Sequence, residues 1–146
     1  MENRGPQMAN NNEDTFTDNL DNFAGGCLCG EIRCESLNPP YNVGFCHCGM
    51  CRKAMGNLFE TWVILKRKDM HYVTREPDWY ESSETVRRGF WGKCGSPIVY
   101  QLTEKDFDAV WIGSIDNPVH YNPRSHWHTE NKIPWVDMMD HLPVKS

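Results

Sequence analysis

The sequence predicts a mainly β fold with little helix, and three observations support this. Segments rich in β-branched and aromatic residues recur along the chain, most clearly at 58–65. The 11 glycines and 9 prolines of the 146-residue chain interrupt these segments with turn signals. Pro123, Pro134 and Pro143 exclude a long helix from the C-terminal part. The length and the 39% hydrophobic content fit one domain with a single core.

The expected elements can be placed in chain order from the same signals. Pro39 and Pro40 mark a loop, and Gly56 is expected to end a single helical turn. In order, we expect partial alternation over 27–35, a loop over 37–42, a strand over 43–46, a helical turn over 51–55, strands over 58–65, 70–73, 85–90, 97–100 and 109–115, and an irregular tail from residue 122.

Residues 1–22 are expected to form a disordered acidic leader, and 23–146 a single zinc-binding domain. The leader has few large apolar residues, and it carries five carboxylates against Arg4 alone. The formal net charge of the whole chain is −5, so the remainder is nearly neutral. That balance lacks the excess of lysine and arginine that nucleic-acid binding requires, and we expect a small molecule as the partner instead.

Targeting signals are absent from the sequence as it stands. It has no stretch of about 18 apolar residues, so no membrane span is expected. It also has no apolar segment of the kind found in secretion signals. The 7 cysteines are therefore expected to be reduced, in the cytoplasm or alternatively in the nucleus.

The run Cys46-His47-Cys48-Gly49-Met50-Cys51 indicates a metal site. Alternate residues of an extended segment point to the same face, so this spacing can place three sulfurs around one zinc ion at about 2.3 Å. Cysteines this close are badly placed to form disulfides with each other. Three thiolates leave one tetrahedral position open, which is typical of catalytic zinc. His47 is expected to be a packed histidine or a hydrogen-bond partner rather than a ligand.

Cys27, Cys29 and Cys94 form a second candidate site with a weaker signal, because they are far apart in the sequence. A structural zinc ion normally has four ligands, and only three are evident. The fourth could be Cys34, a histidine, water or nothing. Cys34 would lie on the opposite face of a regular strand, which favours a buried apolar thiol.

The segment from Ser125 to Trp135 combines polar and aromatic residues on an expected loop. His126 and Glu130 are candidate catalytic residues, because either could move a proton at a zinc-bound substrate. The alternative is that the tryptophans pack against the core and the polar groups are solvated.

These motifs together resemble the glutathione-dependent formaldehyde-activating enzyme family, which includes the centromere-protein-V-like proteins. The resemblance covers about residues 25–142. It rests on Gly25-Gly26-Cys27-Leu28-Cys29-Gly30, Cys46-His47-Cys48-Gly49-Met50-Cys51-Arg52, Gly92-Lys93-Cys94-Gly95-Ser96-Pro97, Gly113-Ser114-Ile115-Asp116, and His126 with Lys132-Ile133-Pro134-Trp135.

The resemblance implies an Mss4-like fold of small antiparallel sheets with two zinc sites. The cysteine run at 46–51 would hold the catalytic zinc, whose open position meets water or the sulfur of glutathione. The other three cysteines match ligands of a structural zinc. The family usually has Cys-x-x-Cys where this chain has Trp91-Gly92-Lys93-Cys94. An indole cannot ligate zinc in this way, so this site either binds zinc weakly or is replaced by packing of the Trp91 ring.

The activity that the resemblance implies joins formaldehyde to glutathione as S-hydroxymethylglutathione, which is carbon–sulfur lyase chemistry in the reverse direction. Zinc would lower the pKa of the incoming thiol, and the thiolate would attack the aldehyde carbon. One alternative is a zinc-dependent lyase or hydrolase that acts on a larger metabolite, since the chain has 6 tryptophans. Another is a non-catalytic zinc-binding interaction module, which the short acidic leader disfavours.

Overall fold

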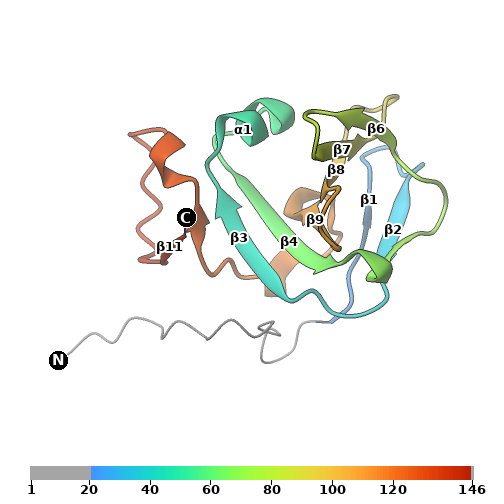
Figure 1. Ribbon diagram of the computed structural model, residues 1–146. Helices are drawn as coiled ribbons and strands as arrows, with labels where there is room; N and C mark the ends of the chain where they lie inside the picture. Colours follow the sequence, from blue (N-terminus) through green and yellow to red (C-terminus); the bar gives the residue numbers. More distant parts are fainter. Residues whose placement is uncertain (1–20, 146) are drawn as a thin grey trace.

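The computed structural model describes residues 21–145 and contains two β-sheets and one α-helix (Figure 1). The smaller sheet has three antiparallel strands in the order β1-β2-β5. The larger has eight strands in the order β11-β10-β3-β4-β9-β8-β7-β6. The strands are β1 Ala24–Gly26, β2 Arg33–Ser36, β3 Asn42–Cys46, β4 Glu60–Lys66, β5 Met70–Tyr72, β6 Asp78–Glu81, β7 Val86–Phe90, β8 Pro97–Leu102, β9 Phe107–Trp111, β10 His126–Trp127 and β11 Val144–Lys145. The predicted mainly β, Mss4-like class is confirmed.

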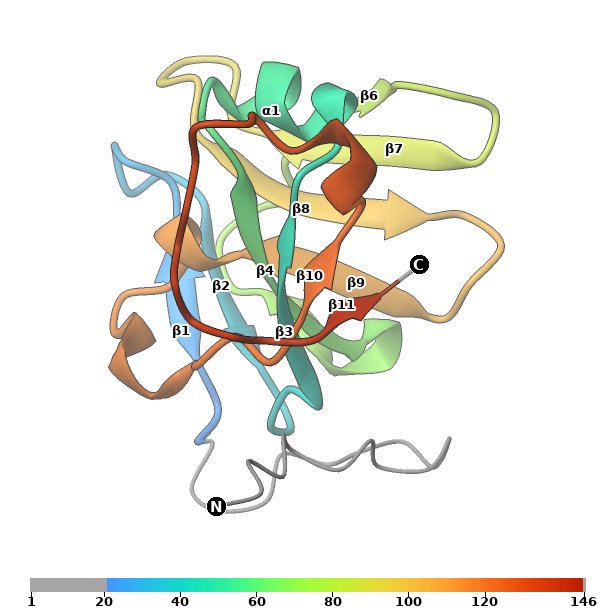
Figure 2. The ribbon, with the colours of Figure 1, turned by 90° about the vertical axis from the view of Figure 1, so that its left-hand side faces the viewer.

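The larger sheet is mixed rather than purely antiparallel. Its strands from β3 to β6 pair antiparallel, whereas β10 pairs parallel with both β3 and β11. Figure 2 shows the C-terminal segment crossing in front of β3 and β4, which brings β10 and β11 to that edge. No helix within residues 21–145 is long and apolar enough to cross a membrane.

One face of the larger sheet carries the core. Val43, Val63, Val110 and Val99 stand side by side across β3, β4, β9 and β8, and all four are fully buried. They belong to the main hydrophobic cluster, which includes residues of the smaller sheet such as Cys34. Because side chains alternate along a strand, the residues between these valines face the opposite side of the sheet.

That opposite face carries a second cross-strand row: Asn42, Ile64, Ala109, Tyr100 and Arg88. One step towards α1, Gly44 pairs with Trp62, and Trp62 pairs with Trp111. A Cβ atom on Gly44 would lie 2.7 Å from two atoms of the Trp62 indole. Glycine is therefore needed here, because the indole lies across the backbone of β3.

Helix α1, Gly49–Met55, begins two residues earlier than predicted. The Sγ atom of Cys48 accepts a hydrogen bond from the backbone N–H of Cys51 at 3.2 Å and so caps the first turn. Gly56 ends the helix, as predicted, with a positive φ of 65°.

Several sequence-based boundaries differ from the structure. The alternation expected over 27–35 is broken by a turn, so β2 begins only at residue 33. The strand expected to reach residue 115 ends at Trp111 and continues as a 3₁₀ turn, Ile112–Ser114. Strand β6 was not expected, because three of its four residues are exposed and it reads as polar. The tail expected to be irregular contributes β10 and β11, two short strands defined by their partners.

The predicted leader lies almost wholly outside the described residues. At its end, the backbone oxygen of Asp21 accepts a hydrogen bond from the Tyr121 hydroxyl at 2.9 Å. The Asn22 side chain donates to the backbone oxygen of Leu37 at 3.1 Å. Contacts with the folded part therefore begin by residue 21.

Candidate metal and substrate site

The Sγ atoms of Cys46, Cys48 and Cys51, here called the sulfur cluster, all lie within 4.8 Å of one another. Cys46 ends β3, Cys48 caps α1, and Cys51 lies in the first turn of that helix. Sulfurs bound tetrahedrally to zinc at about 2.3 Å would be about 3.8 Å apart, so these residues fit a metal ion. A donor set made only of thiolates is typical of zinc and other thiophilic metals.

The hydrogen bonds of the sulfur cluster favour one ionised thiol, that of Cys48, even without a metal. Hydrogen bonds from Cys46 and Cys51 lower the pKa of Cys48. The hydrogen bond with Cys48 correspondingly raises the pKa of Cys46, which retains its proton. The guanidinium of Arg88 adds positive charge, with its Nη2 atom 3.8 Å from the Sγ of Cys51. Metal binding would displace the remaining thiol protons.

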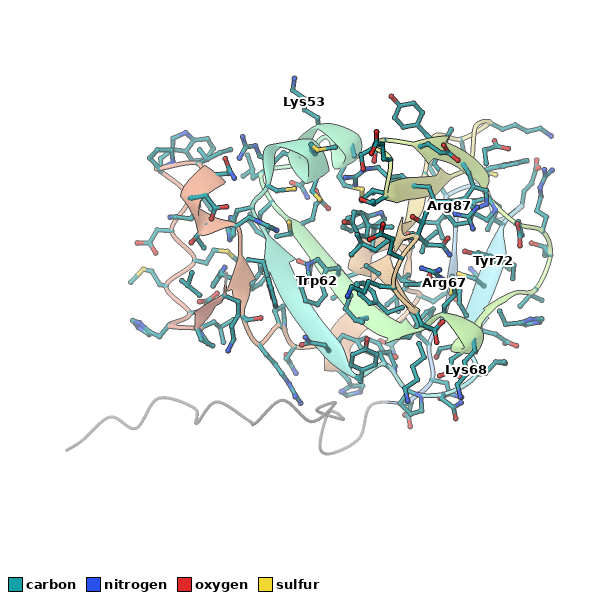
Figure 3. All side chains as sticks on the ribbon, viewed as in Figure 1. Lys53, Trp62, Arg67, Lys68, Tyr72 and Arg87 are labelled. Carbon is teal, nitrogen blue, oxygen red and sulfur yellow. The ribbon has the colours of Figure 1, made fainter. Side chains whose placement is uncertain are left out.

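A cavity of about 1050 Å³ opens beside the sulfur cluster, over the sheet face opposite the valine core. Figure 3 shows Trp62 on this part of the sheet below α1, and Lys53 pointing outward from the helix. The apolar floor of the cavity comes from β4, β8 and β9. It consists of Trp62, Ile64, Leu102, Phe107, Ala109 and Trp111.

The charged residues that line the cavity are all cationic within residues 21–145. They are Arg52 and Lys53 of α1 and Arg88 of β7. Arg52 also has a structural role, since its Nη1 atom donates to the backbone oxygen of Asn131 at 2.6 Å. The Arg88 guanidinium lies 5.1 Å from the centre of the Tyr100 ring. This charge pattern favours an anionic group at the α1 end of the cavity.

Glu60 lies beside the sulfur cluster, outside the cavity lining, and the sequence reasoning missed it. It pairs with Cys46 across β3 and β4, so the two side chains share a face of the sheet. The side chain is 4% exposed, and its Oε1 atom has no hydrogen-bond partner. Burial raises the pKa of the Glu60 carboxyl to about 7. A carboxylate at the start of a strongly apolar strand was the available sequence signal.

The candidate catalytic residue His126 lies in a buried hydrogen-bonded chain. Its Nδ1 atom is 2.9 Å from Nε2 of His47, and its Nε2 atom is 2.9 Å from Oδ1 of Asp140. His126 is 8% exposed and stacks on the Phe45 ring at 5.0 Å, and it is not among the residues that line the cavity. Its position suits a residue that supports the cysteine run.

The other candidate, Glu130, is exposed and also lies outside the cavity lining. Its Oε1 atom is 3.4 Å from Nδ1 of His128. His128 itself lines the cavity, with a positive φ of 58°. The structure thus connects Glu130 to the cavity through His128, which the sequence reasoning did not single out.

Cys27, Cys29 and Cys94 form the second cysteine group, with Sγ atoms within 4.8 Å of one another. The β1–β2 turn supplies the first two, and the turn before β8 supplies the third. The Ser96 hydroxyl lies 3.3 Å from the Sγ of Cys94, and this hydrogen bond lowers the pKa of Cys94 to about 6. The same hydroxyl accepts a hydrogen bond from the backbone N–H of Leu28 at 2.8 Å. This group could also hold a metal ion.

Neither Cys34 nor Trp91 completes the second cysteine group. Cys34 is 1% exposed within the main core, and burial raises the pKa of its thiol to about 11. Trp91 is 3% exposed and belongs to the same core. The guanidinium of Arg75 lies over the Trp91 ring, 4.0 Å from its centre. The large ring is thus used for packing where a cysteine was expected.

Comparisons with known proteins agree with this architecture. Residues 22–131 match the family model described as glutathione-dependent formaldehyde-activating enzyme. A crystal structure of a Rhodobacter sphaeroides protein, a structural-genomics target, superposes with a TM-score of 0.55 at 20% identity. The match covers 84% of this chain and 99% of the other, and it concerns the fold. A search of curated proteins found no match.

Proposed function

The chain belongs to the glutathione-dependent formaldehyde-activating enzyme family, and on that premise we propose that it is a zinc-dependent carbon–sulfur lyase. Its substrate would be the adduct of an aldehyde with glutathione or a related thiol. The observation that carries the proposal is the sulfur cluster at the wall of a large cavity. Three thiolates would hold the ion, and a set of three protein ligands is typical of a zinc that also binds a substrate group.

A zinc ion in the sulfur cluster would supply a positive centre that lowers the pKa of a bound thiol. In the condensing direction, the thiol sulfur forms a bond to the aldehyde carbon, the carbonyl π bond breaks, and the oxygen takes up the proton lost by sulfur. In the lyase direction, the hydroxyl loses that proton, the carbonyl re-forms, the C–S bond breaks, and the sulfur keeps the bonding electrons and takes up the proton. Both directions balance without an oxidant or a reductant.

The residues of the chain have separate roles in this proposal. Arg88 receives the substrate oxygen that gains negative charge, because its guanidinium lies beside Cys51 and lines the cavity. His128, with Glu130 behind it, carries the proton between sulfur and oxygen. His126 supports the cysteine run through His47. The second cysteine group serves as a structural zinc site.

The proposal is tested by replacing one ligand. Cys48→Ser should lose the zinc of the sulfur cluster, and with it the ability to speed the breakdown of S-hydroxymethylglutathione followed by NMR. Cys34→Ala is the matched control, because Cys34 is a buried thiol outside both cysteine groups. A Cys48→Ser protein with the zinc content and activity of the control would contradict the proposal.

The thiolate ligands need reducing conditions, which supports a cytoplasmic or nuclear location.

A further inference from the structure

The cavity is larger than formaldehyde requires. Its volume of about 1050 Å³ is at the upper end of the range for pockets that enclose drug-sized ligands, about 300–1,000 Å³. Formaldehyde adds one carbon and one oxygen to the thiol. Glutathione would fill part of the cavity, but the apolar floor beyond it would then face only water, which is unfavourable for apolar surface.

The apolar floor extends well away from the sulfur cluster. Trp111 packs against Cys46 and Cys51 at one end, and Phe107 lines the other end of the same strand. Trp111 lies four residue steps after Phe107 along the strand, a rise of about 13 Å. The floor is therefore long enough for a substrate body of two fused rings or more.

Aromatic side chains form much of this surface. The indole of Trp62 lies tilted against that of Trp127 with ring centres 6.1 Å apart, and both line the cavity. Tyr100 and Trp111 meet edge to face at 6.3 Å. Rings in these arrangements favour a flat aromatic ligand, because a further aromatic ring can stack or pack edge to face against them.

Charge and apolar surface divide the cavity between the two halves of an adduct. The cations Arg52, Lys53 and Arg88 lie at the α1 end, where glutathione carboxylates could be received. The floor from Ile64 to Phe107 carries no charge. We infer that the aldehyde half of the substrate is bulky and aromatic, and that it lies along this floor.

This inference rests on the proposed function, and binding of two stable thioethers to the zinc-loaded protein tests it. S-(2-naphthylmethyl)glutathione represents the adduct of a bulky aromatic aldehyde, and S-methylglutathione the adduct of formaldehyde. Isothermal titration calorimetry should show the naphthyl probe binding at least tenfold tighter, a difference of about 1.4 kcal/mol. Equal affinities would overturn the inference.

A substitution in the floor locates the binding. Ala109 lies midway along it and is 4% exposed, so Ala109→Phe should fill the cavity and reduce the affinity ratio of the probes at least fivefold. Val119→Phe adds the same ring at an exposed site and should keep the wild-type ratio. Leu102→Ser makes the floor polar and should also lower the affinity ratio of the probes. It serves as the second floor variant in case Ala109→Phe fails to fold. Retention of the ratio in both floor variants would overturn the inference.

Failure of the proposed function is distinguishable in the same titrations. If neither thioether binds but 2-naphthaldehyde alone does, the inference that the cavity floor binds an aromatic aldehyde is supported. Glutathione is then excluded as the thiol. If S-methylglutathione binds as tightly as the naphthyl probe, glutathione is retained as the thiol of the substrate and a bulky aldehyde is excluded. If none of the three binds, both proposals fail.

Discussion

The Nε2 atom of His47 lies 2.9 Å from the Nδ1 atom of His126, so the residue between two cysteines of the sulfur cluster is held by the C-terminal segment. Asp140 accepts a hydrogen bond from Nε2 of His126, which makes Nδ1 of that ring the acceptor for the Nε2–H of His47. The carboxylate thus determines the tautomers of both histidines. Burial lowers the pKa of His47, in keeping with a neutral ring.

Replacing His126 with Leu should destabilise the protein and loosen the sulfur cluster. The buried Nε2–H of His47 would lose its acceptor, which costs about 1–3 kcal/mol. Urea unfolding and the rate of zinc release to a chelator measure the two effects. Asp140→Asn keeps an acceptor for His126 and should have the smaller effect. Loss of lyase activity in His126→Leu without any change in stability or zinc release would instead favour a catalytic role for His126.

Trp91→Cys should raise the zinc content of the second cysteine group. It adds a thiolate near Cys94, where three ligands are present in the wild-type protein. Loss of the buried ring costs about 3–5 kcal/mol before any zinc binds. Trp91→Ser makes a similar void without a thiolate, so zinc retained after chelator treatment should be higher in Trp91→Cys. Equal zinc contents in these two variants, or two equally resistant zinc ions in the wild type, would contradict a weakened site.

Deleting residues 1–20 should leave zinc content and melting temperature unchanged. Deleting residues 1–23 should lower the melting temperature by at least about 5 °C, because Phe23 is 4% exposed in the main core. The backbone of Phe23 also exchanges hydrogen bonds with Ser36. A loss of zinc content or a lower melting temperature after the shorter deletion would contradict this prediction. It would show that residues 1–20 contribute to the folded protein.

Breaking the ion pair between Arg67 and the buried Asp108 should make stability more sensitive to pH. Burial raises the pKa of Asp108, and Arg67, whose Nε atom is 2.9 Å from Oδ1, opposes that effect. In Arg67→Met the pKa of Asp108 should rise further, so the folded state holds a proton that the unfolded state releases near pH 3.9. Stability should then fall as pH rises above that value.

Urea unfolding at several pH values measures this effect, and breaking the pair should cost about 3–5 kcal/mol at neutral pH. The double variant Arg67→Met with Asp108→Asn has no buried carboxyl at this position and serves as the control. Its stability should fall less with rising pH than that of Arg67→Met, because no carboxyl titrates at this position. A parallel pH dependence in Arg67→Met and the double variant would contradict the prediction.

The sequence alone determined the local features of this protein. The spacing of the cysteine run depends on alternation along a few residues, and the end of α1 depends on Gly56, whose positive φ favours glycine. Strands β3, β4, β7 and β8 were expected within a few residues of their bounds. Family membership followed from motifs in order, and the family match at residues 22–131 confirms it.

Only the tertiary structure decided which distant residues share the site. Arg88 reaches Cys51 because β7, β8, β9 and β4 pair in one register, and Glu60 shares a face with Cys46 for the same reason. His126 meets His47 through a two-residue parallel pairing that carries no local signal. Register is set by burying the valine row across β3, β4, β9 and β8 together. A one-residue shift of a strand would turn its cavity-facing side chains into the core.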